Sequence, residues 1–136
     1  MQKVKPQNLS SEIEKYLKEY KEEIDEDVKQ EATQTAKRVK DELKRISPID
    51  RNSHRGRHYA DGWAISTKSS TKDGYYSKKI WNATDYQLTH LLEFGHATKN
   101  GGHVNAQPHI RPTEDKYRVQ FTENLERDIK KWHLKN

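Results

Sequence analysis

A single stripe of apolar residues constrains this chain more than any other feature. From Leu17 to Ile46 the apolar side chains recur at steps of three or four residues, the repeat of one face of an α-helix. Ser11 and Glu14 form a capping box before it, and Ser47-Pro48 ends it. The pattern predicts one helix of roughly 35 residues, about 50 Å long at 1.5 Å per residue. The stripe comprises Ile13, Tyr16, Leu17, Tyr20, Ile24, Val28, Ala32, Ala36, Val39, Leu43 and Ile46.

The stripe is longer than a small domain can cover by itself. The 136 residues are most simply one domain, but only 30% of them are hydrophobic, so the core is expected to be thin and completed by neighbouring subunits. We therefore expect the N-terminal part of the stripe to be a subunit interface, formed by Ile13, Leu17, Tyr20 and Ile24. The alternative is an exposed charged helix that packs only through its C-terminal half.

The rest of the chain predicts an α+β fold. We expect a single domain over residues 1–136, with a long N-terminal helix (1–46), a basic loop (47–62) and a hairpin-helix-loop-helix core (63–136). Two segments rich in β-forming residues, 63–68 and 75–82, flank an Asp-Gly turn and indicate an antiparallel β-hairpin.

Two further helices follow the hairpin. Thr84 and Gln87 form a capping box that predicts a short central helix, and Gly95 is expected to end it. The segment after Gly95 is predicted to be irregular. Pro112-Thr113 is predicted to begin a C-terminal helix, whose apolar positions again recur at steps of three or four.

Charge and composition exclude several classes of protein. The net charge of +5 is concentrated in residues 47–112, where nine Lys/Arg stand against five Asp/Glu. Weak contact with DNA through the loop at 51–58 is consistent with this excess, although four net charges are few for a dedicated DNA-binding protein. The chain has no cysteine and therefore no disulfide or cysteine zinc site. Its N-terminus has no apolar signal core, and we expect no membrane partner.

The segment His90–Pro112, HLLEFGHATKNGGHVNAQPHIRP, contains four of the seven histidines and is the strongest candidate for chemistry. His90 and Glu93 share a helix face, and His96 follows, so a metal site is one interpretation. The segment lacks the metalloprotease pattern of two histidines four residues apart with a glutamate after the first. The interpretation we favour is a structural elbow, in which a buried histidine donates to a backbone carbonyl or to Glu93.

No other catalytic arrangement is evident in the sequence. Gly101-Gly102 lacks the lysine of a phosphate-binding loop, and the serines have no surrounding glycine elbow. We predict no catalytic residue, no cofactor and no metal ligand.

Residues Tyr86–Pro112 resemble a phage protein family. The core LLEFGH, followed by HIRP, is similar to the small neck or minor tail components encoded in the head-tail joining gene cluster of lambda-like, long-tailed bacteriophages and prophages. The resemblance covers roughly residues 47–130, but IDRN stands at 49–52, where the family commonly has a Thr-Gly pair.

The resemblance implies a non-enzymatic virion assembly protein at the head-tail junction. It implies other phage neck, head-completion or tail proteins as partners, a homo-oligomeric ring in the virion, and assembly in the host cytoplasm. The positions to which it assigns structural or assembly roles are Trp63, Tyr86, His90, Leu91, Leu92, Glu93, Gly95, His96, Gly102, Pro108, His109 and Pro112. Two alternatives remain, a DNA-binding or histidine-dependent nuclease-like phage protein and a toxin-like RNA nuclease.

Overall fold

The computed structural model describes residues 9–49, 58–70, 72 and 75–135. The described elements, in chain order, are α1 (Leu9–Ile46), the short 3₁₀ helix η2 (Tyr59–Gly62), β1 (Trp63–Ser70), β2 (Tyr75–Asn82), α2 (Tyr86–Phe94), β3 (His96–Ala97), β4 (His103–Val104) and α3 (Ile110–Lys135). The chain is therefore α+β and mostly helical, which confirms the predicted fold class. The predicted turn at Asp73-Gly74 and most of the basic loop lie outside the described residues.

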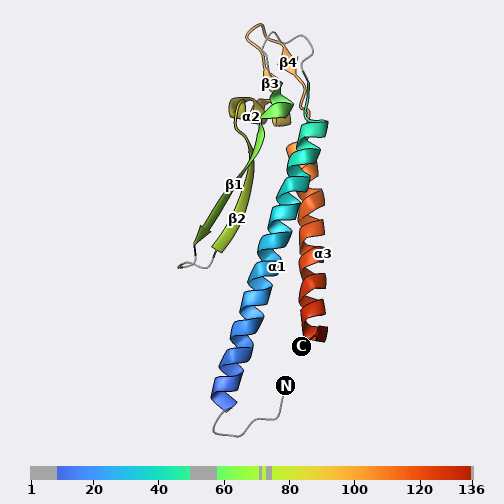
Figure 1. The fold of residues 1–136 in the computed structure, drawn as a ribbon. Coiled ribbons are helices and arrows are strands. Elements are labelled where there is room, and N and C mark those ends of the chain that lie inside the picture. The colour runs from blue at the N-terminus through green and yellow to red at the C-terminus, as the bar shows by residue number, and fades with distance from the viewer. Residues whose placement is uncertain (1–8, 50–57, 71, 73–74, 136) are drawn as a thin grey trace.

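The two long helices lie side by side and run in opposite directions (Figure 1). Partly buried polar contacts join them: Asn124 of α3 donates to the Glu31 carboxylate of α1 at 2.6 Å, and the Tyr117 hydroxyl donates to Glu42 at 2.8 Å. Nearer the C-terminus, the buried Trp132 packs edge-on against Tyr20 of α1, with ring centroids 4.5 Å apart. The first turns of α1 extend beyond the end of α3 (Figure 1).

The β-hairpin packs along α1 (Figure 1). Its strands are antiparallel, with Trp63 opposite Asn82 and Ser70 opposite Tyr75. The hydrophobic core lies where hairpin, α1 and the start of α3 meet. Its buried members are Leu43, Tyr59 and Trp63, with Val39, Ile80, Leu88, Leu92 and Ile110 packed around them. The thin core expected from composition is thus concentrated at one end of the molecule.

The helices begin within a few residues of their predicted starts, and at α3 a side chain distant in sequence supplies the cap. α1 begins at Leu9, so Ser11 lies within it. α2 begins at Tyr86 after Asp85, and the Thr84 hydroxyl lies within hydrogen-bonding distance of the Asn82 and Asp85 side-chain oxygens instead. α3 begins at Ile110, which places Pro112 in the first turn, where its missing N–H costs no helical hydrogen bond.

Two parts of the chain are more ordered than the sequence indicated. The end of the predicted loop forms η2, in which Tyr59, Ala60 and Gly62 are buried. The segment after Gly95, predicted to be irregular, contains a small antiparallel pairing in which His96 lies opposite Val104. A turn through Gly101, with φ of 82°, joins the two short strands.

Gly95 is required by both conformation and space, which yields a first testable prediction. Its φ is 76°, and an added Cβ would lie 2.6 Å from the Val104 carbonyl oxygen and 2.9 Å from the Ala106 nitrogen. Gly95→Ala is therefore expected to lower the free energy of unfolding by about 2–4 kcal/mol. Gly101→Ala is the matched control, because φ is equally positive there but no heavy atom lies within 4 Å of the added Cβ. Its expected cost is only about 1 kcal/mol. Equal losses in urea denaturation would contradict the role assigned to the crowding at Gly95.

Candidate functional site: a buried elbow and two exposed apolar patches

The buried elbow is the connection between α2 and α3, and Glu93 holds it together. The Glu93 carboxylate accepts three backbone N–H groups at the start of α3: His109 at 2.8 Å, Ile110 at 3.0 Å and Arg111 at 2.9 Å. These are the N–H groups that a helix start leaves without a partner. The negative charge of the Glu93 carboxylate also lies at the positive end of the α3 dipole. A side chain 16 residues upstream thus supplies the N-terminal cap of α3.

His109 links the same elbow to the core. Its ring is 2% exposed, and Nδ1 lies 2.8 Å from the Gln107 carbonyl oxygen and 3.2 Å from Glu93 Oε2. Because these oxygens accept, Nδ1 carries the proton. Nε2 lies 2.8 Å from the Tyr59 hydroxyl. Burial, followed by the charges of Glu93 and Asp85, raises the pKa of Tyr59, so its hydroxyl stays protonated and can donate to Nε2.

Trp63 completes the packing around this histidine. The rings of Tyr59 and Trp63 both meet His109 edge-on. The Trp63 Nε1 donates to the Ser47 hydroxyl at 2.7 Å, and that hydroxyl donates to the Leu43 carbonyl at the end of α1. Hydrogen bonds and edge-on ring contacts together therefore tie α1, η2, β1, α2 and α3 at one point. Every member has a structural partner, and the arrangement fits a hydrogen-bonded strut.

The Glu93 pKa reflects this capping. Burial raises the Glu93 pKa, but the N–H groups of Arg111, His109 and Ile110 together outweigh it, so its pKa lies below the ordinary value of 4.5. A carboxyl whose pKa is lower in the folded state stabilises the fold fully above the unfolded pKa. That contribution is lost as the pH falls through the folded pKa.

The lowered pKa of Glu93 predicts how the stability of the chain depends on pH. The urea midpoint of the wild-type chain is expected to fall as the pH is lowered from about 5 to about 3, because Glu93 must be protonated on unfolding. Other carboxylates contribute to this fall, so the measurement is a comparison with Glu93→Gln, whose amide does not titrate. The variant should be less stable at neutral pH, and its stability should depend less steeply on acid. Parallel pH profiles for the two proteins would contradict the assigned role.

The remaining histidines of the segment do not join His109. His90 is exposed on α2 with its ring 4.9 Å from that of Phe94, so the strut interpretation does not extend to it. His103 is exposed on β4. Among the described residues, no group of three or more histidine, aspartate or glutamate side chains is placed to hold a metal ion. The Nδ1 atom of His96 is buried with no hydrogen-bond partner in the described part of the chain.

The other positions implied by the resemblance are distributed around the elbow. Leu92 packs on the core, and its carbonyl accepts the Gln107 N–H at 2.7 Å, which draws the returning chain onto α2. Gly102 is exposed, and its carbonyl accepts the Thr98 N–H at 2.9 Å within the small turn. Pro108 and Pro112 are exposed on either side of the start of α3. Tyr86 and Leu91 are exposed on α2.

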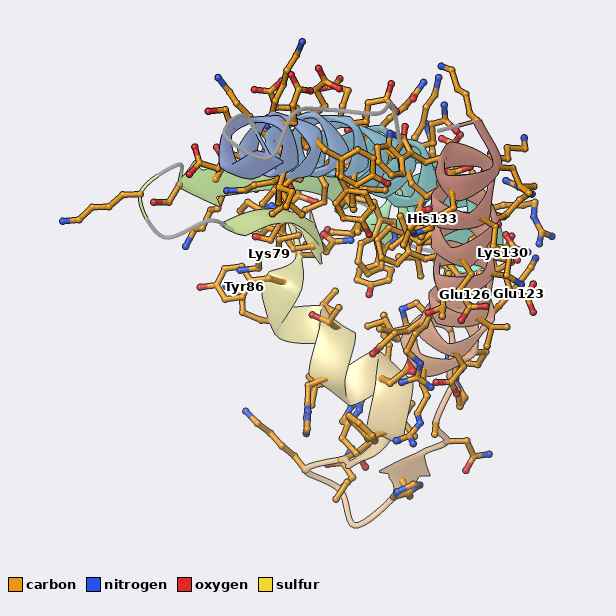
Figure 2. The ribbon with its side chains drawn as sticks, turned by 90° about the horizontal axis from the view of Figure 1, so that it is seen from below. Lys79, Tyr86, Glu123, Glu126, Lys130 and His133 are labelled. Carbon is orange, nitrogen blue, oxygen red and sulfur yellow. The ribbon has the colours of Figure 1, made fainter. Side chains whose placement is uncertain are left out.

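Exposed residues of α2 form what we call the α2 patch, namely Tyr86, His90, Leu91 and Phe94. Tyr86, His90 and Phe94 are spaced by four residues and therefore share one helix face. Phe94 is 66% exposed and Tyr86 61% exposed. In Figure 2, α2 projects away from the packed helices with Tyr86 at its start. A shallow hollow beside the patch is lined in part by His90, Phe94 and Arg111.

Exposed residues near the start of α1 form what we call the α1 patch, namely Ile13, Tyr16 and Leu17, with exposed fractions of 40, 40 and 56%. Of the four predicted interface positions, Tyr20 and Ile24 are partly covered, the former by Trp132 of α3. The chain therefore partly covers Tyr20 and Ile24 itself and leaves Ile13 and Leu17 exposed. The two patches lie at opposite ends of the molecule (Figure 1).

Sequence reasoning missed several residues of the elbow and patches. Tyr59 and Ser47 were assigned only to a loop, and Thr113, whose buried hydroxyl donates to the His109 carbonyl, only to a helix start. Nothing local identifies them, because their partners lie far away in sequence. Phe94 was detectable, since its spacing of four from His90 and eight from Tyr86 marks an exposed aromatic face.

Comparison with known proteins identifies one family. A family model described as "Bacteriophage HK97-gp10, putative tail-component" matches residues 11–95, more than half of the chain. The match confirms the resemblance to a family of phage tail components. It extends further upstream than that resemblance, through α1, and it ends at Gly95. No curated protein and no solved structure matches the chain. In the part of the chain that the structure describes, no helix is long and apolar enough to cross a membrane.

Proposed function

Because the chain belongs to the HK97-gp10-like family of bacteriophage tail components, we propose that it is a non-enzymatic structural protein of the virion acting at the head-tail junction. The observation that carries the proposal is the family match across α1, the hairpin and α2. The elbow supports it, because its buried histidine and glutamate are engaged in hydrogen bonds that hold helices together. The protein then works by presenting surfaces, as a neck or tail component.

The exposed patches support assembly into a homo-oligomeric ring. Exposed apolar groups that share a helix face are typical of protein-protein contact sites. One patch at each end of the chain gives a subunit two different contact surfaces, which a cyclic assembly uses. The remaining partners in this proposal are other neck, head-completion or tail proteins, met in the host cytoplasm during assembly.

Labelling the virion tests the location. Particles of the phage or prophage that carries this gene are treated with gold-labelled antibody against the purified protein and imaged by electron microscopy. Label at the junction between head and tail is the expected result. Label along the tail tube or at the distal tip would retain a tail component but overturn the junction role, and unlabelled particles would exclude a virion protein.

Weak contact with DNA is a secondary proposal, supported by charge. The loop at 51–58 contains Arg51, Arg55 and Arg57, and residues 51–57 lie outside the described residues. Binding to double-stranded DNA should be weak and should fall steeply with salt, because each phosphate contact releases counterions. Fluorescence anisotropy from about 50 to 200 mM salt measures the slope. Cleavage of that DNA in the presence of Mg²⁺ or Zn²⁺ would instead favour the nuclease alternative.

A further inference from the structure

The β-hairpin carries more positive than negative charge. Residues 63–82 contain one acidic residue, Asp73, and four lysines, namely Lys68, Lys72, Lys78 and Lys79. Neither strand of the hairpin contains an aspartate or a glutamate. Asp73 follows Lys72 between the strands and lies outside the described residues. The lysines on the strands therefore have no acidic neighbour within β1 or β2.

Two of these lysines lie on one face of the hairpin together with two serines. In the strand register Lys79 is opposite Ser66, and Lys68 is opposite Ser77. Residues directly opposite each other share a face, as do residues two apart along a strand, so we call these four residues the open face. Lys68, Ser77 and Lys79 are exposed. The other face carries Ile80, which packs on the core, and Figure 2 shows Lys79 on the side of the hairpin away from α1.

The charges of the open face are not neutralised by an ion pair. The Lys79 ammonium lies 5.5 Å from the centroid of the Trp81 ring, and the Trp81 indole donates to the Ser66 hydroxyl at 2.9 Å. These contacts hold Lys79 over the open face without removing its charge. Among the described residues, neither Lys68 nor Lys79 pairs with a carboxylate.

The side of the hairpin that faces α1 is less positive than the open face. Lys29 of α1 and Lys78 of β2 lie over the Tyr76 ring, at 5.9 and 5.5 Å from its centroid. Asp25 and Glu26 are both exposed about one helical turn before Lys29. Their carboxylates offset the positive charge on that side.

The elements beside the open face add little exposed negative charge. Asp85, which precedes α2, and Glu93, within α2, are buried. Asp61 is exposed in η2, which joins the hairpin at the end away from its turn. Glu114 lines the hollow along the C-terminal half of α2 rather than the end that adjoins the hairpin, and Asp115 follows it on α3. In the described part of the chain, the charge of Lys68 and Lys79 is therefore left available to a partner.

Building on the proposed contact with DNA, we propose that the open face binds the phosphate backbone of double-stranded DNA without reading its base sequence. Lysine and serine side chains are typical ligands of DNA phosphates. Both residue types are depleted where proteins contact each other, which disfavours an acidic protein as the partner. The major groove of B-DNA admits a two-stranded β-ribbon, and β1 and β2 form a sheet of two strands in the described chain. The hairpin thus adds a second surface to the loop at 51–58.

Neutralising the two lysines tests this contact. Lys68→Gln and Lys79→Gln are introduced together in the full chain, and the anisotropy of a labelled duplex follows binding from about 50 to 200 mM salt. The variant should bind more weakly, and the slope of log K against log salt should fall by about two, since each lost phosphate contact removes about 0.9. Both side chains are exposed, so the fold should be retained, which circular dichroism checks.

Lys130→Gln combined with Lys131→Gln is the matched control. Both lysines are exposed on α3, where Figure 2 shows Lys130, so the same change of net charge is made away from the hairpin. The control should keep the wild-type slope. An equal fall of the slope in both double variants would show that only net charge matters and would overturn the proposal, as would a wild-type slope in the hairpin variant.

Two further arms distinguish other surfaces and other partners. Arg55→Gln combined with Arg57→Gln neutralises the loop instead of the hairpin. A fall of the slope confined to this loop variant would assign the contact to the loop alone and overturn the open face. Labelled polyglutamate replaces the duplex in the second arm. Wild-type binding to polyglutamate as tight as binding to DNA at the same salt would favour an acidic protein and overturn DNA as the partner.

The outcome is separable from the junction role. Gold label at the junction with an unchanged slope in the hairpin variant would overturn the open face and leave the role intact. A lowered slope with no label at the junction would retain the open face and overturn the role.

Discussion

Glu93→Ala is expected to lower the free energy of unfolding by about 3–5 kcal/mol, among the largest effects of any single substitution in this chain. The carboxylate accepts three N–H groups at the start of α3, and its removal leaves them without a partner in a largely buried elbow. Urea denaturation followed by circular dichroism measures the loss. Glu126→Ala, which removes an exposed carboxylate from α3, is the control and should cost less than about 0.5 kcal/mol.

A second comparison separates the buried histidine from the exposed one. His109→Ala should destabilise the chain by about 2–4 kcal/mol, because it removes the partner of Tyr59 and opens a cavity. His90→Ala should leave stability nearly unchanged, since that ring is exposed. Similar losses for both variants, or a loss of stability on adding a chelator to the wild-type protein, would contradict the strut interpretation.

Placing aspartate at Ile13 and Leu17 together should have the largest effect on assembly. Both side chains are exposed, so the stability of the isolated chain should change by no more than about 1 kcal/mol. At the centre of an interface each loss is worth about 2 kcal/mol, and two together weaken association about a thousandfold. The infectious titre of phage supplied only with this variant should fall, and DNA-filled heads without tails should accumulate.

Val119→Asp is the control for that experiment. Val119 is 54% exposed on α3 and belongs to neither patch, so the same change of apolar to charged side chain is made outside the proposed contact. If phage supplied with the Ile13→Asp, Leu17→Asp variant reached the wild-type titre, as phage supplied with Val119→Asp should, the α1 patch would take no part in assembly.

The sequence predicted the elements of this fold better than their contacts. The three-and-four repeat identified α1, because a stripe of apolar side chains has the same spacing whatever covers it. For that reason the repeat could not show that Tyr20 meets Trp132 while Leu17 stays exposed. Coverage depends on where α3 ends relative to α1.

At the elbow, too, the sequence predicted the kind of structure but not the contacts that form it. The short distance in sequence between His90 and Glu93 suggested that they act together, yet Glu93 points to the start of α3 and His90 to solvent. The interpretation that a buried histidine donates to a carbonyl or to Glu93 describes His109, but four histidines of the segment satisfied that description equally. The choice among them depends on Tyr59, which lies 50 residues away.

The most direct test of the account is joining of heads to tails in vitro. A lysate of phage that lacks this gene is separated into DNA-filled heads and free tails, which are mixed with and without the purified protein and then assayed for infectious particles. The account predicts that wild-type protein restores infectious particles, that the Ile13→Asp, Leu17→Asp variant does not, and that added metal makes no difference. Heads and tails that join equally well without the protein, or mutant particles that already carry normal attached tails, would contradict it.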